Sequence, residues 1–385
     1  MNSGAFYPVS CSCGISRRVV LKLGGAVLSL ALGHPIRALA RQLDRADHLR
    51  ASLHAMVARE ASDPQNPWDV MHGIRALGPS FALRDGRPAV GTLLRQVVRV
   101  AEIKGRRLLF VDEKDEGHSN VFLKTLLEAG VPWETSFPVQ GVRYTLKDLF
   151  ESARLRFRFD PQDRETIRTN LAWSLIAFAH RPERRWTNLH GERIDLLEVV
   201  EVALEAYEAA MREFRGTLGP DGVPGLKSEI HRFTCGGAHV LYSLETCARA
   251  GLVTAGQRKR LEVQLDLHFP RLRQEIALIK TFFRRAERQM GPEVVRLPEA
   301  DASLKFLGHS LEVIGYGANH GLLGLAPARQ QAVDETRAEL VRAVAAMERE
   351  DLTALRGRNA DLARNLVGDA CHALRGVRLL TGERT

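Results

Sequence analysis

The residues with the clearest chemical potential lie in the segment 306–312, Phe-Leu-Gly-His-Ser-Leu-Glu. His309 and Glu312 are three positions apart, so in a helix they share a face. Tyr316 continues that face and is a candidate substrate-binding residue. A histidine beside a glutamate can divide proton donation and acceptance near neutral pH, or bind a metal ion. The spacing therefore predicts a catalytic site here. The structural alternative is a histidine bonded to the backbone, with Glu312 in solvent.

A second candidate site is the segment 233–239, Phe-Thr-Cys-Gly-Gly-Ala-His. At i and i+4 of a helix, Cys235 and His239 would face one point and could bind zinc together with His309 or His231. Three protein ligands with an open position would make the site catalytic, whereas four would make it structural. The alternative is a helix start that Thr234 caps and that the two glycines allow to pack closely.

Two more histidines complete the predicted active site. His118 follows the acidic run 112–116 and is a candidate general base, although a solvated loop with a helix cap would have the same sequence. Trp68 and His72 share a helical face and could form a stacking wall for a ligand, or simply belong to the core. If the chain is an enzyme, we expect His72, His118, His239 and His309 to converge.

The elements that must position these residues are helices. Hydrophobic residues recur at helical spacing over residues 194–214, 257–289, 330–350 and 359–380, with a break or bend expected at Pro270. Only residues 106–111 resemble a strand, and they could equally begin a helix. Loops are expected at residues 216–225 and 291–301. These patterns predict an all-α fold.

Small residues beside one large ring recur along the chain, at His72, His118, Trp173, His239, His309 and His372. The intervals leave room for one helix hairpin between successive units. This predicts that residues 41–385 form a single domain in which helix hairpins close into an α/α toroid, and small residues let the inner helices approach closely. An irregular helical bundle is the alternative.

The string Gly-His-Ser-Leu-Glu at residues 308–312 resembles the Gly-His-x-x-Glu element of N-acylglucosamine 2-epimerase and related (α/α)6-toroid sugar enzymes. In that family the element lies at the mouth of the ring, and its His and Glu serve substrate binding or proton transfer. The resemblance implies a saccharide or related polyhydroxylated substrate that undergoes hydrolysis, elimination or epimerisation. This chain departs from the family in its aromatic residues, because all four tryptophans lie in the first half.

Residues 1–40 are predicted to be an export signal. Ser-Arg-Arg-Val-Val-Leu-Lys at 16–22 precedes an uncharged apolar run at 23–33, and Ala-Leu-Ala at 38–40 offers a cleavage site. The adjacent arginines resemble a twin-arginine signal, which implies the twin-arginine export machinery and a periplasmic or secreted protein. An uncut membrane anchor is the alternative, but a span needs about 20 apolar residues.

Composition excludes several classes of protein. Of the 385 residues, 45% are hydrophobic and 26% charged, as in soluble globular proteins. The net charge is +9, but with few aromatic residues and no block of Lys or Arg there is no nucleic-acid footprint. Phosphate-binding glycine loops, nucleophile elbows and haem-attachment motifs are absent from the sequence. Three of the five cysteines lie beyond residue 40, which argues against a disulfide framework.

Together these features favour an exported all-α enzyme with His/Glu acid–base chemistry, assisted by zinc if the Cys235 site is real. The alternative is a non-catalytic helical binding or scaffold protein of the periplasm, with or without a structural metal.

Overall fold

The computed structural model describes residues 33–216 and 228–383. Over these residues the chain is predominantly α-helical, which confirms the predicted all-α class. The chain falls into two compact units, Met1–Arg45 and Ala46–Thr385. The predicted twin-arginine motif at 16–22, and all but the last residue of the apolar run at 23–33, lie outside the described residues. Among the described helices, none is long and apolar enough to cross a membrane.

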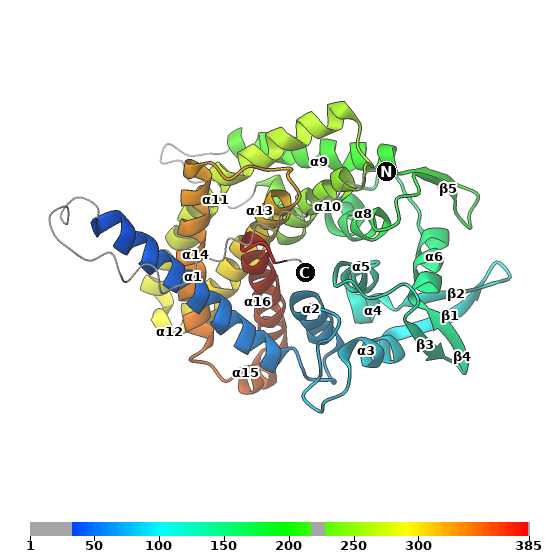
Figure 1. Ribbon diagram of the computed structural model, residues 1–385, viewed down its shortest axis with the longest axis horizontal. Helices are drawn as coiled ribbons and strands as arrows, with labels where there is room; N and C mark the ends of the chain where they lie inside the picture. Colours follow the sequence, from blue (N-terminus) through cyan, green and yellow to red (C-terminus); the bar gives the residue numbers. More distant parts are fainter. Residues whose placement is uncertain (1–32, 217–227, 384–385) are drawn as a thin grey trace, which may run out of the picture. The chain divides into compact units, whose positions relative to one another are not determined.

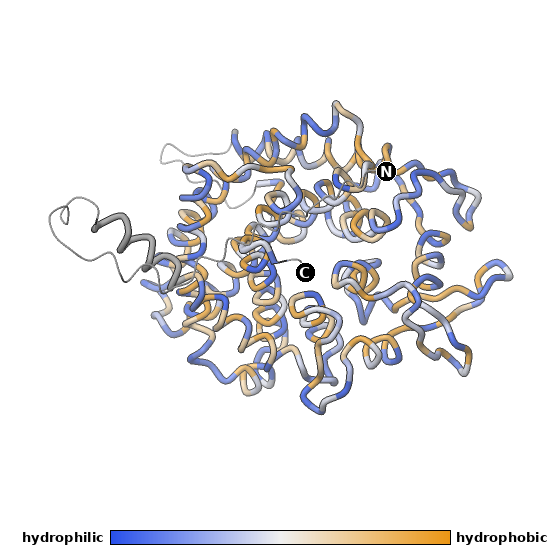
Figure 2. Tube along the Cα trace, viewed as in Figure 1, coloured by the Kyte–Doolittle hydropathy of each residue, from blue (hydrophilic) through white to orange (hydrophobic). Residues whose placement is uncertain are grey.

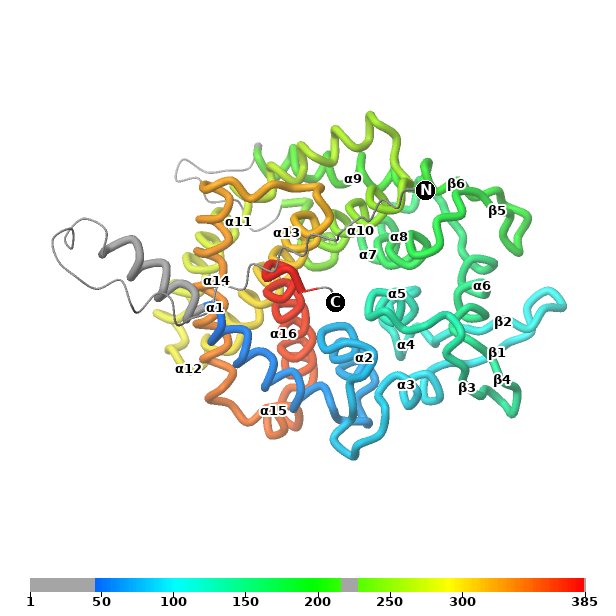
Figure 3. Tube along the Cα trace, in the orientation of Figure 1, coloured from blue at the N-terminus to red at the C-terminus, as the bar shows by residue number. Residues whose placement is uncertain are grey.

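Six helices of the second unit pack in a closed circuit. They are α2 (Pro67–Leu77), α5 (Val121–Glu128), α8 (Leu171–Ala179), α10 (Ala238–Arg249), α13 (His309–Asn319) and α16 (Ala360–Leu380). Each packs against the next, and α16 packs against α2, so the last helix of the chain closes on the first of the six (Figure 1). Figure 3 shows this closure as the red α16 beside the blue α2. Five of the six recurring rings of the sequence lie in these helices, and His118 lies just before α5.

The sequences of the inner helices explain their burial. Every residue of α8, Leu-Ala-Trp-Ser-Leu-Ile-Ala-Phe-Ala, is buried, and so is every residue of α5. A helix that is apolar on all sides has to be surrounded by other elements. Figure 2 shows these two helices largely in hydrophobic colours, between the other elements of this unit.

Small residues set the distance between α13 and α16. A Cβ atom built on Gly376 would lie 2.7 Å from the backbone nitrogen of Glu312, and one built on Gly308 would lie 3.0 Å from the Cβ of Ala373. Larger side chains would push the two helices apart. The close approach brings side chains of α16 into contact with those of α13, as the small-residue pattern predicted.

Helix α1 (Gly33–Glu60) begins in the first unit and ends in the second. The other described helices of the second unit lie around this circuit or connect its members. The longer ones are α3 (Ala89–Val97), α6 (Leu146–Arg156), α9 (Leu196–Gly216), α11 (Ala255–Met290), α12 (Pro292–Ser303), α14 (Pro327–Met347) and α15 (Leu352–Arg358). Helices α9, α11, α14 and α16 confirm the four segments predicted from periodicity. Helix α11 continues through Pro270, so the expected break does not occur.

One local prediction needs correction. The segment 291–301, predicted to be a loop, is helix α12, whose first residue Pro292 has a backbone dihedral already suited to a helix start. Residues 106–111, which resembled a strand but could also have begun a helix, are a strand, β2 (Arg106–Val111), paired with β1 (Val98–Ile103). The predicted loop at 216–225 lies almost wholly outside the described residues.

Two further hairpins were not predicted: β3 (Ser136–Val139) with β4 (Val142–Thr145), and β5 (Arg185–Thr187) with β6 (Arg193–Asp195). Their strands are too short to show a clear alternation of apolar and polar residues. For the first of these hairpins, a signal was present in the Gly141 of its two-residue turn, because tight hairpin turns favour glycine. In the structure Gln140 and Gly141 both have positive φ.

Candidate functional site

Six side-chain contacts join seven rings into a continuous chain, here called the aromatic arc. Along it the ring centroids are 4.7 Å apart for Trp68–His72, 5.3 Å for His72–His372, 3.8 Å for His372–His309, 4.6 Å for His309–His239, 4.0 Å for His239–Trp173 and 5.4 Å for Trp173–His118. The rings come from α2, α16, α13, α10, α8 and the loop before α5. The structure thus brings together the four predicted histidines, with Trp173 between His118 and the others.

Two histidines of the arc and a neighbouring cysteine could hold a metal ion. One ligand atom from each of Cys235, His239 and His309 lies within 4.8 Å of the other two. A set of one thiol and two imidazoles suits zinc. His309 thus takes the place of the third ligand, for which His231 was the alternative. The Nε2 of His231 instead lies 3.0 Å from a carboxylate oxygen of Glu275.

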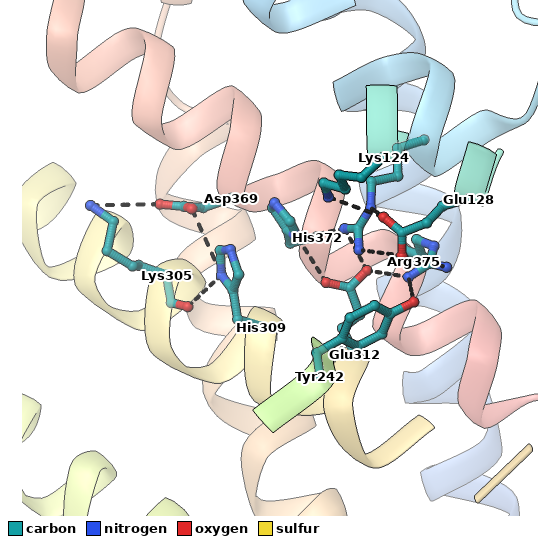
Figure 4. Close-up of polar contacts among 10 residues, drawn as sticks. Lys124, Glu128, Tyr242, Lys305, His309, Glu312, Asp369, His372 and Arg375 are labelled. Carbon is teal, nitrogen blue, oxygen red and sulfur yellow. Dashed lines mark hydrogen bonds and ion pairs between the residues drawn. The ribbon is translucent and has the colours of Figure 1, made fainter. Parts of the chain in front are cut away.

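Backbone contacts orient the ring of His309 (Figure 4). Its Nδ1 lies 2.6 Å from the carbonyl oxygen of Lys305, to which it donates, so Nε2 keeps its lone pair free. The Asp369 carboxyl lies 3.8 Å from the same Nδ1 and 3.9 Å from the Lys305 ammonium. Metal-binding histidines commonly donate their other ring nitrogen to a carbonyl or carboxylate in this way.

Cys235 reaches the site from a turn and not from a helix. Helix α10 begins at Ala238, and Cys235, Gly236 and Gly237 all have positive φ, at 50°, 61° and 79°. The helical i, i+4 argument was therefore wrong in its geometry, although the two side chains do meet. Thr234 does not cap the helix but donates to the carbonyl of Thr169. A non-glycine residue in this conformation is uncommon and is often found at functional sites.

Burial keeps the histidines of the arc uncharged. It lowers the pKa of His72 and of His309 to about 3, and it lowers the pKa values of His239 and His372 well below the usual range. The neutral imidazole is the form that ligates metals. Burial, with a smaller effect from Asp369, raises the pKa of the Cys235 thiol. A bound cation would act in the opposite direction and favour the thiolate.

Next to the aromatic arc lies a buried ion-pair core, made up of Arg75, Lys124, Glu128, Glu312 and Arg375 (Figure 4). Glu312 Oε1 lies 2.5 Å from Nη1 of Arg75 and 2.5 Å from Nη1 of Arg375. Glu128 Oε2 lies 2.7 Å from Nε of Arg75 and 3.0 Å from Nζ of Lys124. Burial raises the pKa of Glu312, but the guanidinium groups of Arg75 and Arg375 outweigh it and hold this pKa below its usual range. Glu312 is therefore an ionised, firmly held carboxylate.

The partner of Glu312 among the histidines is His372, whereas the sequence suggested His309. Nδ1 of His372 lies 2.8 Å from Oε2 of Glu312 and also 2.8 Å from Nη1 of Arg75. It can donate to the carboxylate when it carries a proton, or accept from the guanidinium when it does not. Only one of these contacts is a hydrogen bond at a time, so the position of one proton distinguishes two states of this core.

Sequence reasoning missed four of the five members of the ion-pair core. A signal was present for two of them, because Lys124 and Glu128 stand four apart in the otherwise apolar sequence of α5. Charged residues on a helix that is apolar all round have to be paired inside the protein.

Tyr316 lies apart from the other predicted ligand-binding residues, Trp68 and His72. It lines a cavity of ≈650 Å³ together with residues near the C-terminal ends of α5, α8, α10, α13 and α16. The arc residues His239 and His309 lie at the opposite ends of α10 and α13. The face shared by His309, Glu312 and Tyr316 therefore runs from the aromatic arc, past the ion-pair core, to this cavity.

The three cysteines of the described residues, Cys235, Cys247 and Cys371, form no disulfide bond. Comparison with protein-family models, curated proteins and solved structures found no match for this chain.

Proposed function

We propose that this chain is an exported, metal-assisted enzyme whose metal ion is held by Cys235, His239 and His309. The observation that carries the proposal is the convergence of three ligand atoms within 4.8 Å from two different helices and a left-handed turn. Three protein ligands leave a position for water or for a substrate oxygen, as in catalytic zinc sites. Zinc bound there would lower the pKa of a coordinated water molecule and polarise a substrate oxygen.

The neighbouring side chains then have separate roles. The carbonyl of Lys305 fixes the tautomer of His309. His372 is the neutral histidine whose tautomer can change, because its Nδ1 can either donate to Glu312 or accept from Arg75. Glu312, held by two arginines, is a positioning residue for His372 and not the general base. His118 and Trp68, partly exposed at the two ends of the aromatic arc, would contact the substrate.

The proposal includes the (α/α)6-toroid arrangement and a saccharide or related polyhydroxylated substrate. The closed circuit of α2, α5, α8, α10, α13 and α16 supports the arrangement, since each member carries or adjoins one recurring ring. The resemblance of residues 308–312 to the element of the sugar enzymes supports the class of substrate. The arc also offers the indole of Trp68, a suitable surface for stacking against a sugar ring.

Metal analysis of the full chain tests the metal site. We expect one zinc per chain in the wild type and in Cys247→Ser, a buried cysteine outside the group, and loss of zinc in Cys235→Ser. With cobalt in place of zinc, the visible spectrum should show a thiolate-to-metal charge-transfer band that disappears only in Cys235→Ser. A wild-type chain that binds neither ion stoichiometrically contradicts the proposal.

Activity of the zinc-loaded chain on neutral and acidic oligosaccharides tests the reaction. Formation of new reducing ends, unsaturated products or epimers should stop with a chelator and in Cys235→Ser.

The second candidate is a binding or scaffold protein with a structural metal, and the near-complete burial of His239 and His309, only 3% and 2% exposed, favours it. In that case removal of the metal would lower the melting temperature, and no oligosaccharide would be converted.

A further inference from the structure

The cavity at the C-terminal ends of the inner helices is distinct from the proposed metal site. Its volume of ≈650 Å³ falls in the range of small-molecule sites, which is about 300–1,000 Å³. The lining includes Tyr242, Arg249, Tyr316 and Arg375. Nine of the eleven lining residues are polar. The charged groups other than histidines are two arginines and one carboxylate, Glu128, which is itself paired with Arg75 and Lys124. The chemistry of the cavity therefore depends on charge and hydrogen bonding more than on apolar contact.

Below the cavity, the ion-pair core holds more positive than negative charge. Its cations are Arg75, Lys124 and Arg375, and its carboxylates are Glu128 and Glu312, so one positive charge has no counterpart. Another carboxyl that Glu312 acts on is Glu245, which is fully buried. Its two carboxyl oxygens make no hydrogen bond within the described residues, and burial raises its pKa well above the usual range. Burial of an uncompensated positive charge is costly. The cavity at these ends of the inner helices is therefore suited to an anion.

Arg375 links this charge to the cavity. It is 3% exposed, it lines the cavity, and its Nε has no hydrogen-bond partner among the described residues. Its Nη1 donates to the hydroxyl oxygen of Tyr242 at 2.9 Å. Because that oxygen accepts from an arginine, the hydroxyl hydrogen of Tyr242 is available for a ligand.

Arg249 is the second arginine of the cavity. It is exposed at the end of α10, and within the described part of the chain it forms no ion pair. Its Nη1 lies 3.4 Å from the hydroxyl of Tyr316. The ring of Tyr316 in turn contacts that of Tyr242 in a tilted arrangement, with ring centroids 4.7 Å apart. An arginine and a phenol thus stand both at the rim and at the floor of the cavity.

We infer that this cavity binds a small organic anion, with its carboxylate or phosphate group held between Arg249, Arg375 and the hydroxyl of Tyr242. Arginine presents paired N–H donors that match both groups. The inference is independent of the metal site, which lies at the opposite ends of α10 and α13. The chain would then bind an anion in addition to the substrate of the metal site. If one ligand spans both sites, that ligand would carry an acidic group.

Calorimetric titration of the full chain tests this inference, with inorganic phosphate, D-glucuronate and D-glucose as probes. We expect saturable binding of phosphate or glucuronate and none of glucose, which lacks the charge. The stronger of the two anions identifies the group that the site prefers. Binding of no anion, or equal binding of glucose and glucuronate, would overturn the inference.

Four variants locate the binding. Arg249→Gln and Tyr242→Phe should each weaken anion binding about tenfold, the loss of one charge-assisted hydrogen bond. Arg284→Gln is the matched control, because Arg284 is also exposed but donates only to the carbonyl of Lys280 in its own helix. Cys235→Ser should bind the anion like the wild type, even if it has lost metal. Equal affinity in all of these variants would mean that the anion binds elsewhere and would refute the site.

Discussion

His239 and His309 belong to different helices, and their rings meet edge to face with centroids 4.6 Å apart. Neither histidine pairs with a carboxylate as closely as His372 pairs with Glu312. Two neutral imidazoles held this close, with a thiol beside them, form a ready-made set of metal ligands. The first prediction is that His239 and His309, but not the other histidines of the arc, bind the metal ion.

His239→Gln should weaken zinc binding by more than about 100-fold, since even partners of ligands contribute about 10–100-fold. His72→Gln is the control, because His72 is equally neutral and lies in the same arc but is not part of the metal group. Competition with a chromogenic chelator measures both affinities. Equal affinity in the two variants would mean that the ligands have been wrongly assigned.

A second prediction concerns the turn that carries Cys235. In Gly236→Ala the new Cβ would lie 2.6 Å from Cε1 of Phe306 and 2.9 Å from Nη2 of Arg271, at a φ of 61°. We expect a loss of about 3 kcal/mol in the free energy of unfolding, from about 1–2 kcal/mol for the left-handed backbone and the remainder from overpacking.

Gly251→Ala separates these two contributions. Gly251 also has a positive φ, of 74°, but nothing lies within 4 Å of the position of a Cβ atom. Gly251→Ala should therefore lose only the contribution of the left-handed backbone, about 1–2 kcal/mol in the free energy of unfolding measured by urea denaturation. If the two variants lost the same amount, the close packing around Gly236 would have no energetic weight. Loss of zinc in Gly236→Ala alone would further tie this turn to the metal site.

The sequence predicted the all-α class and the meeting of Cys235, His239 and His309, but it did so for different reasons. Helical periodicity is a local property, so α9, α11, α14 and α16 could be located from it. The metal group was predicted from an i, i+4 spacing, whereas the structure makes it with a left-handed turn. Residue type was the informative signal, because thiol and imidazole groups are the side chains that bind zinc.

The ion-pair core could not be predicted in the same way. Arg75, Glu128, Glu312 and Arg375 come from four helices, and only the closed packing of those helices brings them together. The spacing of these residues in the sequence gives no indication that they are in contact. An apolar helix that contains Lys124 and Glu128 shows that buried charges must be compensated, but it does not show by which residues.

The third prediction is that this core is important for stability. Glu312→Gln should lower the free energy of unfolding by about 3–5 kcal/mol, because Arg75 and Arg375 would remain buried with one carboxylate fewer. Glu335→Gln is the control, since Glu335 pairs with Arg273 at 2.9 Å on the surface and should cost less than about 1 kcal/mol. Urea denaturation gives both values. A loss below 1 kcal/mol in Glu312→Gln would show that the core relaxes or admits water.

The fourth prediction concerns pH and involves Glu116, away from the metal group. Burial raises the pKa of Glu116 to about 7, although its carboxylate accepts from the backbone N–H groups of Asn120 and Phe122 at the start of α5. Arg156 lowers this pKa and Glu113 raises it, both by smaller amounts. The folded chain therefore binds a proton here more tightly than the unfolded chain does.

The sign of the effect follows from this difference. The stability that the protonated Glu116 provides is complete below the pKa of an unfolded glutamate, about 4.3, and is lost as the pH rises to about 7. The loss amounts to about 3 kcal/mol, since one pKa unit corresponds to 1.36 kcal/mol. Glu116→Gln, which cannot ionise, should remove this decline. Free energies of unfolding for wild type and variant, measured between pH 5 and 8, should therefore diverge, with the variant gaining relative to the wild type as the pH rises. Parallel curves would show that Glu116 is already ionised, and that the two backbone N–H groups outweigh its burial.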